Sequence, residues 1–175
     1  YPASFVLVSS MNPCPCGYFN HPDKDCVCAP GIVKRYLNKI SGPLLDRIDL
    51  HVEVTPVSYD ELTSTHRPSE TSKDIAKRVV EARKIQETRF KDYKSVYSNA
   101  QMPRRLLLKV CEIDEAGKLI LKRSMEKLQL SARAYDRILK VARTIADLSN
   151  SENISVEHLA EAIHFRTLDR EGWAE

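Results

Sequence analysis

A short apolar run that stops at a cysteine-rich turn constrains the opening of this chain more than any other feature. Residues 5–8 are Phe, Val, Leu and Val, a run that favours a buried strand. The pair Asn12-Pro13 ends a strand and turns the chain. Because open α/β sheets place ligand contacts at the carboxyl ends of their strands, Asn12 is a candidate site residue. The residue type by itself favours the plainer alternative of a turn former.

Two further elements are predicted before residue 58. Pro30 suits the first position of a helix, and apolar residues at helical spacing continue to Ile40. The triplet Ser41-Gly42-Pro43 should end that helix. Over residues 48–54, apolar and polar residues alternate, which predicts a second strand with one buried face.

The rest of the chain is predicted to be a linker followed by helices. Residues 58–71 are polar and contain Pro68, as expected of a linker. Helices are expected over residues 72–90, from Pro103, over 113–128, and after the N-caps Ser131 and Ser155 to about residues 148 and 165. The fold class is therefore α+β and mostly α. Residues 1–57 form an α/β part with two strands, one helix and a cysteine-rich loop, and residues 72–175 form a helical bundle.

The composition excludes several classes of protein. No apolar run approaches the roughly 20 residues that a membrane-spanning helix needs. The net charge of +3 is too small to indicate a nucleic-acid-binding domain by itself. Four of the five cysteines fall within residues 14–28, which is not the pattern of a secreted disulfide framework. A reduced, cytoplasmic protein is predicted.

The polar loop has the donors for a metal site. Its cysteines are Cys14, Cys16, Cys26 and Cys28. Four thiolates are enough to close a tetrahedral zinc site, and a site with four protein ligands is structural rather than catalytic. Pro15 and Gly17 favour a tight turn that presents two sulfurs to one ion. The Cys-x-Cys spacing departs from that of zinc knuckles, His21 could replace one cysteine, and a loop of unligated thiols is the alternative.

Three arginines are candidates for binding phosphate. Arg47 follows a tight turn, from which it could reach a phosphate on a neighbouring subunit. The alternative is a surface ion pair with Asp46 or Asp49. Arg133 lies in the first turn of a predicted helix, where backbone N–H groups favour an anion, and Arg137 lies one turn later on the same face. For Arg133, a solvated charge is the alternative, and Arg137 could assist it.

Three sequence segments are more informative together than separately. Residues 11–17 are Met-Asn-Pro-Cys-Pro-Cys-Gly, residues 44–49 are Leu-Leu-Asp-Arg-Ile-Asp, and residues 130–137 are Leu-Ser-Ala-Arg-Ala-Tyr-Asp-Arg. Together they closely resemble the magnesium-chelatase-like AAA+ ATPases of the ComM (YifB) type, and the resemblance covers nearly the whole chain in order. The first motif is specific to this branch. The second is shared with magnesium chelatase motors and replicative helicases.

The resemblance implies a role for each candidate. Asn12 would be the sensor-1 asparagine that orients the attacking water, and Arg47 the arginine finger that acts in trans on a neighbour's ATP. Arg133 would be the sensor-2 arginine, carried by a helical lid over residues 72–175, with Arg137 assisting. The parent would bind ATP and Mg²⁺, assemble as a hexameric ring, and use DNA as a partner in branch migration during natural transformation.

One departure from the family pattern limits this expectation. The 175 residues contain no Gly-x-x-x-x-Gly-Lys-Ser/Thr phosphate loop and no apolar strand ending in an acidic pair for magnesium. We therefore expect a C-terminal fragment that does not hydrolyse ATP alone. Two alternatives stay open: a motor for inserting metal into a porphyrin, and a non-enzymatic, zinc-stabilised helical binding module. The cysteine loop favours the ComM type over the chelatase motor.

Overall fold

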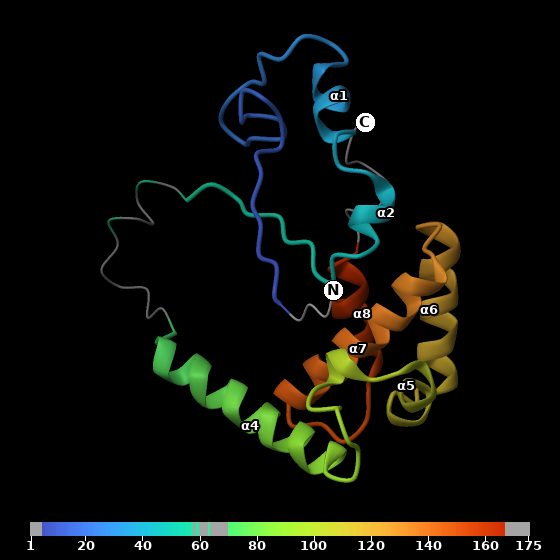
Figure 1. Ribbon diagram of the computed structural model, residues 1–175. Helices are drawn as coiled ribbons and strands as arrows, with labels where there is room; N and C mark the ends of the chain where they lie inside the picture. Colours follow the sequence, from blue (N-terminus) through green and yellow to red (C-terminus); the bar gives the residue numbers. More distant parts are fainter. Residues whose placement is uncertain (1–4, 58, 60–62, 64–69, 167–175) are drawn as a thin grey trace.

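The computed structural model describes residues 5–57, 59, 63 and 70–166 (Figure 1). Its second half is a helical bundle centred on α7 (Ala132–Leu148). This helix contacts α4 (Ser72–Phe90), the 3-10 helix η1 (Asn99–Gln101), α5 (Arg104–Val110) and α8 (Val156–His164). Helix α6 (Glu115–Lys127) packs on α8. The bundle predicted from the helical spacing is therefore confirmed.

The bundle has one apolar core, to which α7 contributes the most residues. Its buried apolar side chains are Phe90, Val96, Met102, Leu106, Leu107, Cys111, Leu121, Ile138, Leu139, Ala142, Ala146, Ile154, Leu159, Ala162 and Ile163. Small residues on α7 let neighbouring helices approach closely, and its long residues fill the space between them. None of the helices in the described part of the chain is long and apolar enough to cross a bilayer.

Local capping sets where the main helices begin. The Ser131 hydroxyl accepts a hydrogen bond from the N–H of Ala134, and Ser155 forms a reciprocal capping box with His158. Both predicted N-caps are confirmed. Helix α4 has the predicted bounds, and α6 begins at Glu115, two residues later than expected, because Asp114 caps it. The cap side chains satisfy N–H groups that no helical carbonyl can reach.

The first helices differ from the prediction in where they begin. Pro30 does not open a helix, because Gly31 adopts a left-handed φ of 78° and α1 (Ile32–Leu37) starts after it. The triplet Ser41-Gly42-Pro43, predicted to end that helix, begins a new one. Ser41 is the N-cap of the one-turn helix α2 (Gly42–Leu45), with Pro43 in its first turn, where a missing N–H costs nothing.

The two predicted strands are not formed within the described residues. Residues 5–8 and 48–54 lack regular secondary structure, and the side chains of Val6 and Val54 are 89% and 85% exposed. A strand is stable only when neighbouring strands satisfy its N–H and C=O groups, and no such neighbour is present in the described part. The prediction of an α+β fold is therefore confirmed only in its helical portion. The predicted linker, residues 58–71, lies mostly outside the described residues.

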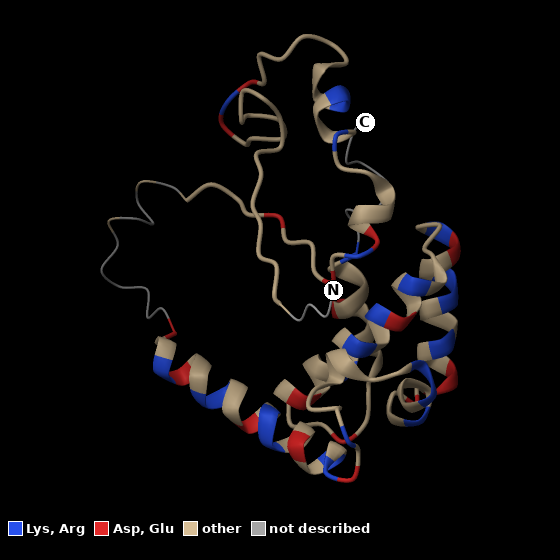
Figure 2. Cartoon of the chain, in the orientation of Figure 1, with Lys and Arg blue, Asp and Glu red and all other residues tan. Residues whose placement is uncertain are grey.

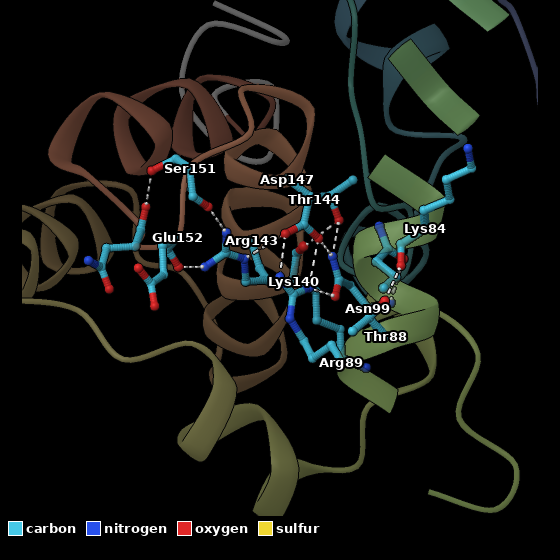
Figure 3. A network of polar contacts seen from close by, with 12 residues as sticks. Lys84, Thr88, Arg89, Asn99, Lys140, Arg143, Thr144, Asp147, Ser151 and Glu152 are labelled. Atoms are coloured by element: carbon cyan, nitrogen blue, oxygen red, sulfur yellow. Dashed lines mark hydrogen bonds and ion pairs between the residues drawn. The ribbon is translucent and has the colours of Figure 1, made fainter. Parts of the chain in front are cut away.

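A buried polar network joins α4, η1 and α7 (Figure 3). The Asp147 side chain is fully buried, and its carboxylate accepts two hydrogen bonds from Arg89, at 2.8 and 2.5 Å. It also accepts from Asn99 at 2.7 Å and from Arg143 at 3.1 Å. The Arg143 guanidinium in turn donates to the carbonyls of Ser151 and Glu152, which holds the loop after α7. Four segments therefore depend on one carboxylate.

Replacing Asp147 with Ala should destabilise the bundle strongly. The change leaves the buried Arg143 and the partly buried Arg89 without their counter-charge, so we expect a loss of about 3–5 kcal/mol in the free energy of unfolding. Urea denaturation followed by circular dichroism measures this loss. The matched control is Asp136→Ala, which breaks an exposed pair with Arg104 and should cost less than about 1 kcal/mol. Equal losses in the two variants would contradict the role given to Asp147.

Candidate functional site

The four loop cysteines converge on one point. The sulfur of Cys14 lies 3.3 Å from that of Cys16 and 3.7 Å from that of Cys26. The sulfurs of Cys16 and Cys26 are 3.5 Å apart. With Cys28 included, all four sulfur atoms lie within 4.8 Å of one another. The loop stands apart from the bundle, beside α1 (Figure 1).

The backbone of the loop builds this cluster locally. Gly17 adopts a left-handed φ of 84°, and its N–H donates to the carbonyl of Cys14, closing the tight turn that the sequence predicts. The N–H of Phe19 donates to the Cys14 sulfur at 3.3 Å. Cys14 is fully buried although the loop around it is exposed. The turn therefore points the Cys14 sulfur inward, toward the other three cysteines.

The sulfur positions fit a tetrahedral zinc ion. With Zn–S bonds of about 2.3 Å, neighbouring sulfurs in a tetrahedron lie about 3.8 Å apart. The sulfurs of Cys14, Cys16 and Cys26 are separated by 3.3–3.7 Å, close to that value. His21 is not part of the cluster. Its Nδ1 accepts the N–H of Asp23, and its ring packs against Tyr18. The donor set is therefore four cysteines.

Thiol acidity differs sharply from one cysteine to another. A hydrogen bond from the backbone N–H of Tyr18, partly offset by desolvation, lowers the pKa of Cys16 to about 6. Burial raises the pKa of Cys111, which lies in the bundle core, to about 12. In Cys28, a backbone hydrogen bond from Cys16 is outweighed by desolvation and by the neighbouring thiols, which raise the pKa to about 12. Because zinc binds the thiolate, Cys16 is the loop thiol most ready to bind a metal.

Arg47 is an exposed side chain on a compact turn. Its own N–H donates to the carbonyl of Leu44, and its guanidinium donates to the carbonyl of Pro43 at 2.5 Å. The ion pairs that the sequence offered as an alternative are not the ones observed. Asp49 pairs with Arg137, and Asp46 lies 3.8 Å from the guanidinium of Arg166.

The two α7 arginines have different surroundings. Arg133 is exposed in the first turn of the helix and forms no ion pair with any described residue. Arg137 is half-buried and donates to the carboxylate of Asp49. Burial lowers the pKa of Arg137, and so does the nearby positive charge of Arg166 and Arg47. Several guanidinium groups therefore gather where α7 meets the 46–51 segment.

Asn12 is exposed directly before the cysteine turn. No hydrogen bond within the described residues joins it to Arg47 or Arg133, and the cysteine loop that it precedes stands away from α7 (Figure 1). The structure thus brings Arg47 and Arg137 into one charged region and leaves Asn12 outside it. Sequence reasoning did not single out Arg166, whose side chain is 1% exposed and reaches the 46–51 segment. No local pattern marks it.

Comparison with known proteins identifies the family to which this chain belongs. Residues 69–166 match the family "Magnesium chelatase, subunit ChlI C-terminal", and residues 1–62 match "Magnesium chelatase, subunit ChlI". The chain belongs to the magnesium chelatase family. The two matches together cover the cysteine loop, the Arg47 turn and the helical bundle.

Similar proteins support the same membership. Competence protein ComM of Haemophilus influenzae is 38% identical over 97% of this chain. YifB of Escherichia coli is 40% identical over 97%, and Rv2897c of Mycobacterium tuberculosis is 34% identical over 95%. The aligned part is 32% of each of these proteins, so the chain spans about a third of the length of the curated relatives it matches. The resemblance to magnesium-chelatase-like proteins of the ComM and YifB type is confirmed.

The cysteine cluster should hold one zinc ion per chain. Metal analysis of protein purified without chelator should find about one zinc, and Cys16→Ser should reduce that content because one ligand is lost. Cys111→Ala is the matched control, since it removes a thiol outside the cluster and should leave the zinc in place. A zinc content near zero in the unmodified protein would contradict the site.

Alkylation by iodoacetamide at pH 7 provides a second readout of the same site. After chelator treatment Cys16 should react first, because its pKa of about 6 leaves it mostly thiolate. Added zinc should protect it. Cys111 should remain unmodified in both states until the protein unfolds. Equal labelling of Cys16 with and without zinc would count against ligation.

Proposed function

We propose that this chain supplies the sensor-1, arginine-finger and sensor-2 residues for ATP hydrolysis in a magnesium-chelatase-like AAA+ ATPase. The observation that carries the proposal is the state of Arg47. This arginine is exposed on a compact turn, and both neighbouring carboxylates, Asp46 and Asp49, are paired with arginines of the bundle. A guanidinium held in this way is available for a phosphate on another subunit.

Arg133 is assigned to the nucleotide of its own chain. It lies at the start of a 17-residue helix, where the free N–H groups and the helix dipole favour an anion. Its exposure, and its lack of an ion-pair partner in the described part, leave all its donors for a phosphate. Arg137 assists with the donors that its pair with Asp49 does not use.

Asn12 and the remaining contacts complete the proposed ATPase. Asn12 would orient the attacking water, and ATP with Mg²⁺ would be held mainly by parts of the longer protein outside these 175 residues. In this assignment residues 1–57 end the ATPase core, 58–71 are a linker, and the helices from residue 72 form the lid. Residues 5–8 and 48–54, most of which are exposed, would then be strands that pair with the rest of the core sheet.

The proposed biological role is DNA branch migration during natural transformation, by a cytoplasmic hexameric ring. Its support is the likeness to a relative named competence protein ComM. Lys and Arg alternate with Asp and Glu along α4 rather than forming one basic stripe (Figure 2). The assembled ring would therefore bind DNA more tightly than this bundle alone.

A motor for metal insertion into a porphyrin is the second candidate, because the matching families carry the name magnesium chelatase. The cysteine cluster favours the ComM type, since the porphyrin reaction gives no evident use for it. DNA-stimulated ATP turnover by the full-length protein would separate the two candidates. Stimulation by a porphyrin-binding partner, without any effect of DNA, would favour the chelatase motor.

Arg47→Ala in the full-length protein should reduce ATP turnover by about 10³-fold or more, because an arginine finger is worth 10³–10⁵ in rate. Nucleotide binding should change little, since the finger acts on the charge that develops in the transition state. Arg123→Ala, which removes an exposed arginine on α6, is the matched control and should leave turnover intact. Arg133→Ala should slow turnover and weaken binding together.

Subunit mixing tests whether Arg47 acts in trans. Rings that combine Arg47→Ala subunits with phosphate-loop variants should regain part of the activity, because some interfaces then pair an intact loop with an intact finger. If mixed rings form and no mixture recovers turnover, Arg47 does not act on its neighbour, and the trans assignment fails.

The 175-residue chain alone should not hydrolyse ATP. It lacks a phosphate loop to position the β- and γ-phosphates and Mg²⁺. Turnover is measured as phosphate release against a buffer blank through successive purification steps. Activity that co-purifies with the chain would refute the assignment of roles above.

A further inference from the structure

Arg166 joins the end of the bundle to the turn that carries Arg47. It directly follows α8 and Phe165, and its side chain is 1% exposed. One guanidinium nitrogen donates to the carbonyl of Ile48, and another lies 3.8 Å from the carboxylate of Asp46. These two partners flank Arg47 on either side in the sequence. Burying a guanidinium costs free energy unless the group is paired. The contacts with Ile48 and Asp46 offset that cost here.

Two further contacts bind the same segment to the bundle. The N–H of His51 donates to the carbonyl of Phe165 at 3.0 Å. Arg137, from α7, donates to the carboxylate of Asp49. The 46–51 segment begins in the turn that ends α2 and has no regular secondary structure beyond it. The contacts with α7 and the end of α8 hold this segment against the bundle. The Arg47 side chain remains exposed between the anchored residues.

We infer that Arg166 is a positioning residue for Arg47, locking the turn onto the end of α8 so that the direction of Arg47 follows the position of the helical bundle. The inference rests on the proposed function, in which Arg47 is the arginine finger. It adds a consequence. A bundle that shifts when its own chain binds nucleotide carries Arg47 with it, which couples one ATP site to the next around a ring.

The test is Arg166→Gln in the full-length protein, which keeps a polar side chain but removes the charge and most donors. ATP turnover should fall between about 10-fold and 100-fold, the loss expected when a catalytic group is misplaced by about 1 Å. Nucleotide binding should remain within about twofold of the unmodified protein. Amide hydrogen exchange over residues 48–52 should accelerate, because the His51 N–H loses its fixed partner at Phe165.

A double variant separates positioning from a general structural effect. If Arg166 acts only through Arg47, then Arg47→Ala/Arg166→Gln should turn over ATP no more slowly than Arg47→Ala alone. A further loss in the double variant would overturn the inference. Turnover of Arg166→Gln equal to that of the unmodified protein, with Arg47→Ala inactive, would also overturn it. An Arg47→Ala protein with full activity would instead refute the proposed function.

Asp46→Asn supplies the same test if Arg166→Gln fails to fold. This change removes the ion pair from its less buried side, where the Asp46 side chain is 17% exposed, and preserves its shape. It should lower turnover in the same direction and accelerate exchange over the same residues. Unchanged turnover and unchanged exchange in Asp46→Asn would overturn the inference. Asp136→Asn, which alters the ion pair between α7 and Arg104 at the start of α5, is the matched control.

Discussion

The carboxylate of Asp147 carries its negative charge inside the bundle, and two arginines and an asparagine meet it there. A buried charge is stable only when its hydrogen-bond partners are correctly placed. The helices must therefore pack in the arrangement that places these partners around Asp147. Arg89 ties α4 to this carboxylate, and Asn99 ties the 3-10 helix to it. Arg143 also donates to the carbonyls of the loop that leads into α8. The apolar core is non-directional by comparison and would accept several helix arrangements.

The charged region at the other end of α7 depends on that arrangement. Once α7 and α8 are set, Arg137 and Arg166 reach outward to Asp49, Asp46 and the Ile48 carbonyl. The chain from residue 46 to residue 51 then lies against the bundle without forming a strand. An exposed arginine between two anchored carboxylates is a group held in position and not neutralised, which is what a phosphate-binding role requires.

The cysteine loop is built on a different principle and is nearly independent of the bundle. Its convergence comes from a left-handed glycine and from backbone N–H groups that donate within the turn. Four sulfurs held close together by local geometry make a site whose affinity is decided over 15 residues of sequence. For that reason the sequence alone could propose this donor set. In the structure the four sulfurs converge, while His21 accepts a hydrogen bond from Asp23 outside the cluster.

Sequence alone determined the features whose causes are local: the spans of α4, α7 and α8, the N-caps Ser131 and Ser155, and the cysteine turn. Caps and helical spacing act over three or four residues, so a linear pattern contains them. Tertiary structure decided the charge partners. Arg137 and Asp49 are 88 residues apart, and Arg166 lies 118 residues from Ile48, so no spacing rule joins them. It also decided against the two strands in the described residues, because alternation marks a strand's faces but a sheet exists only where another strand supplies the hydrogen bonds.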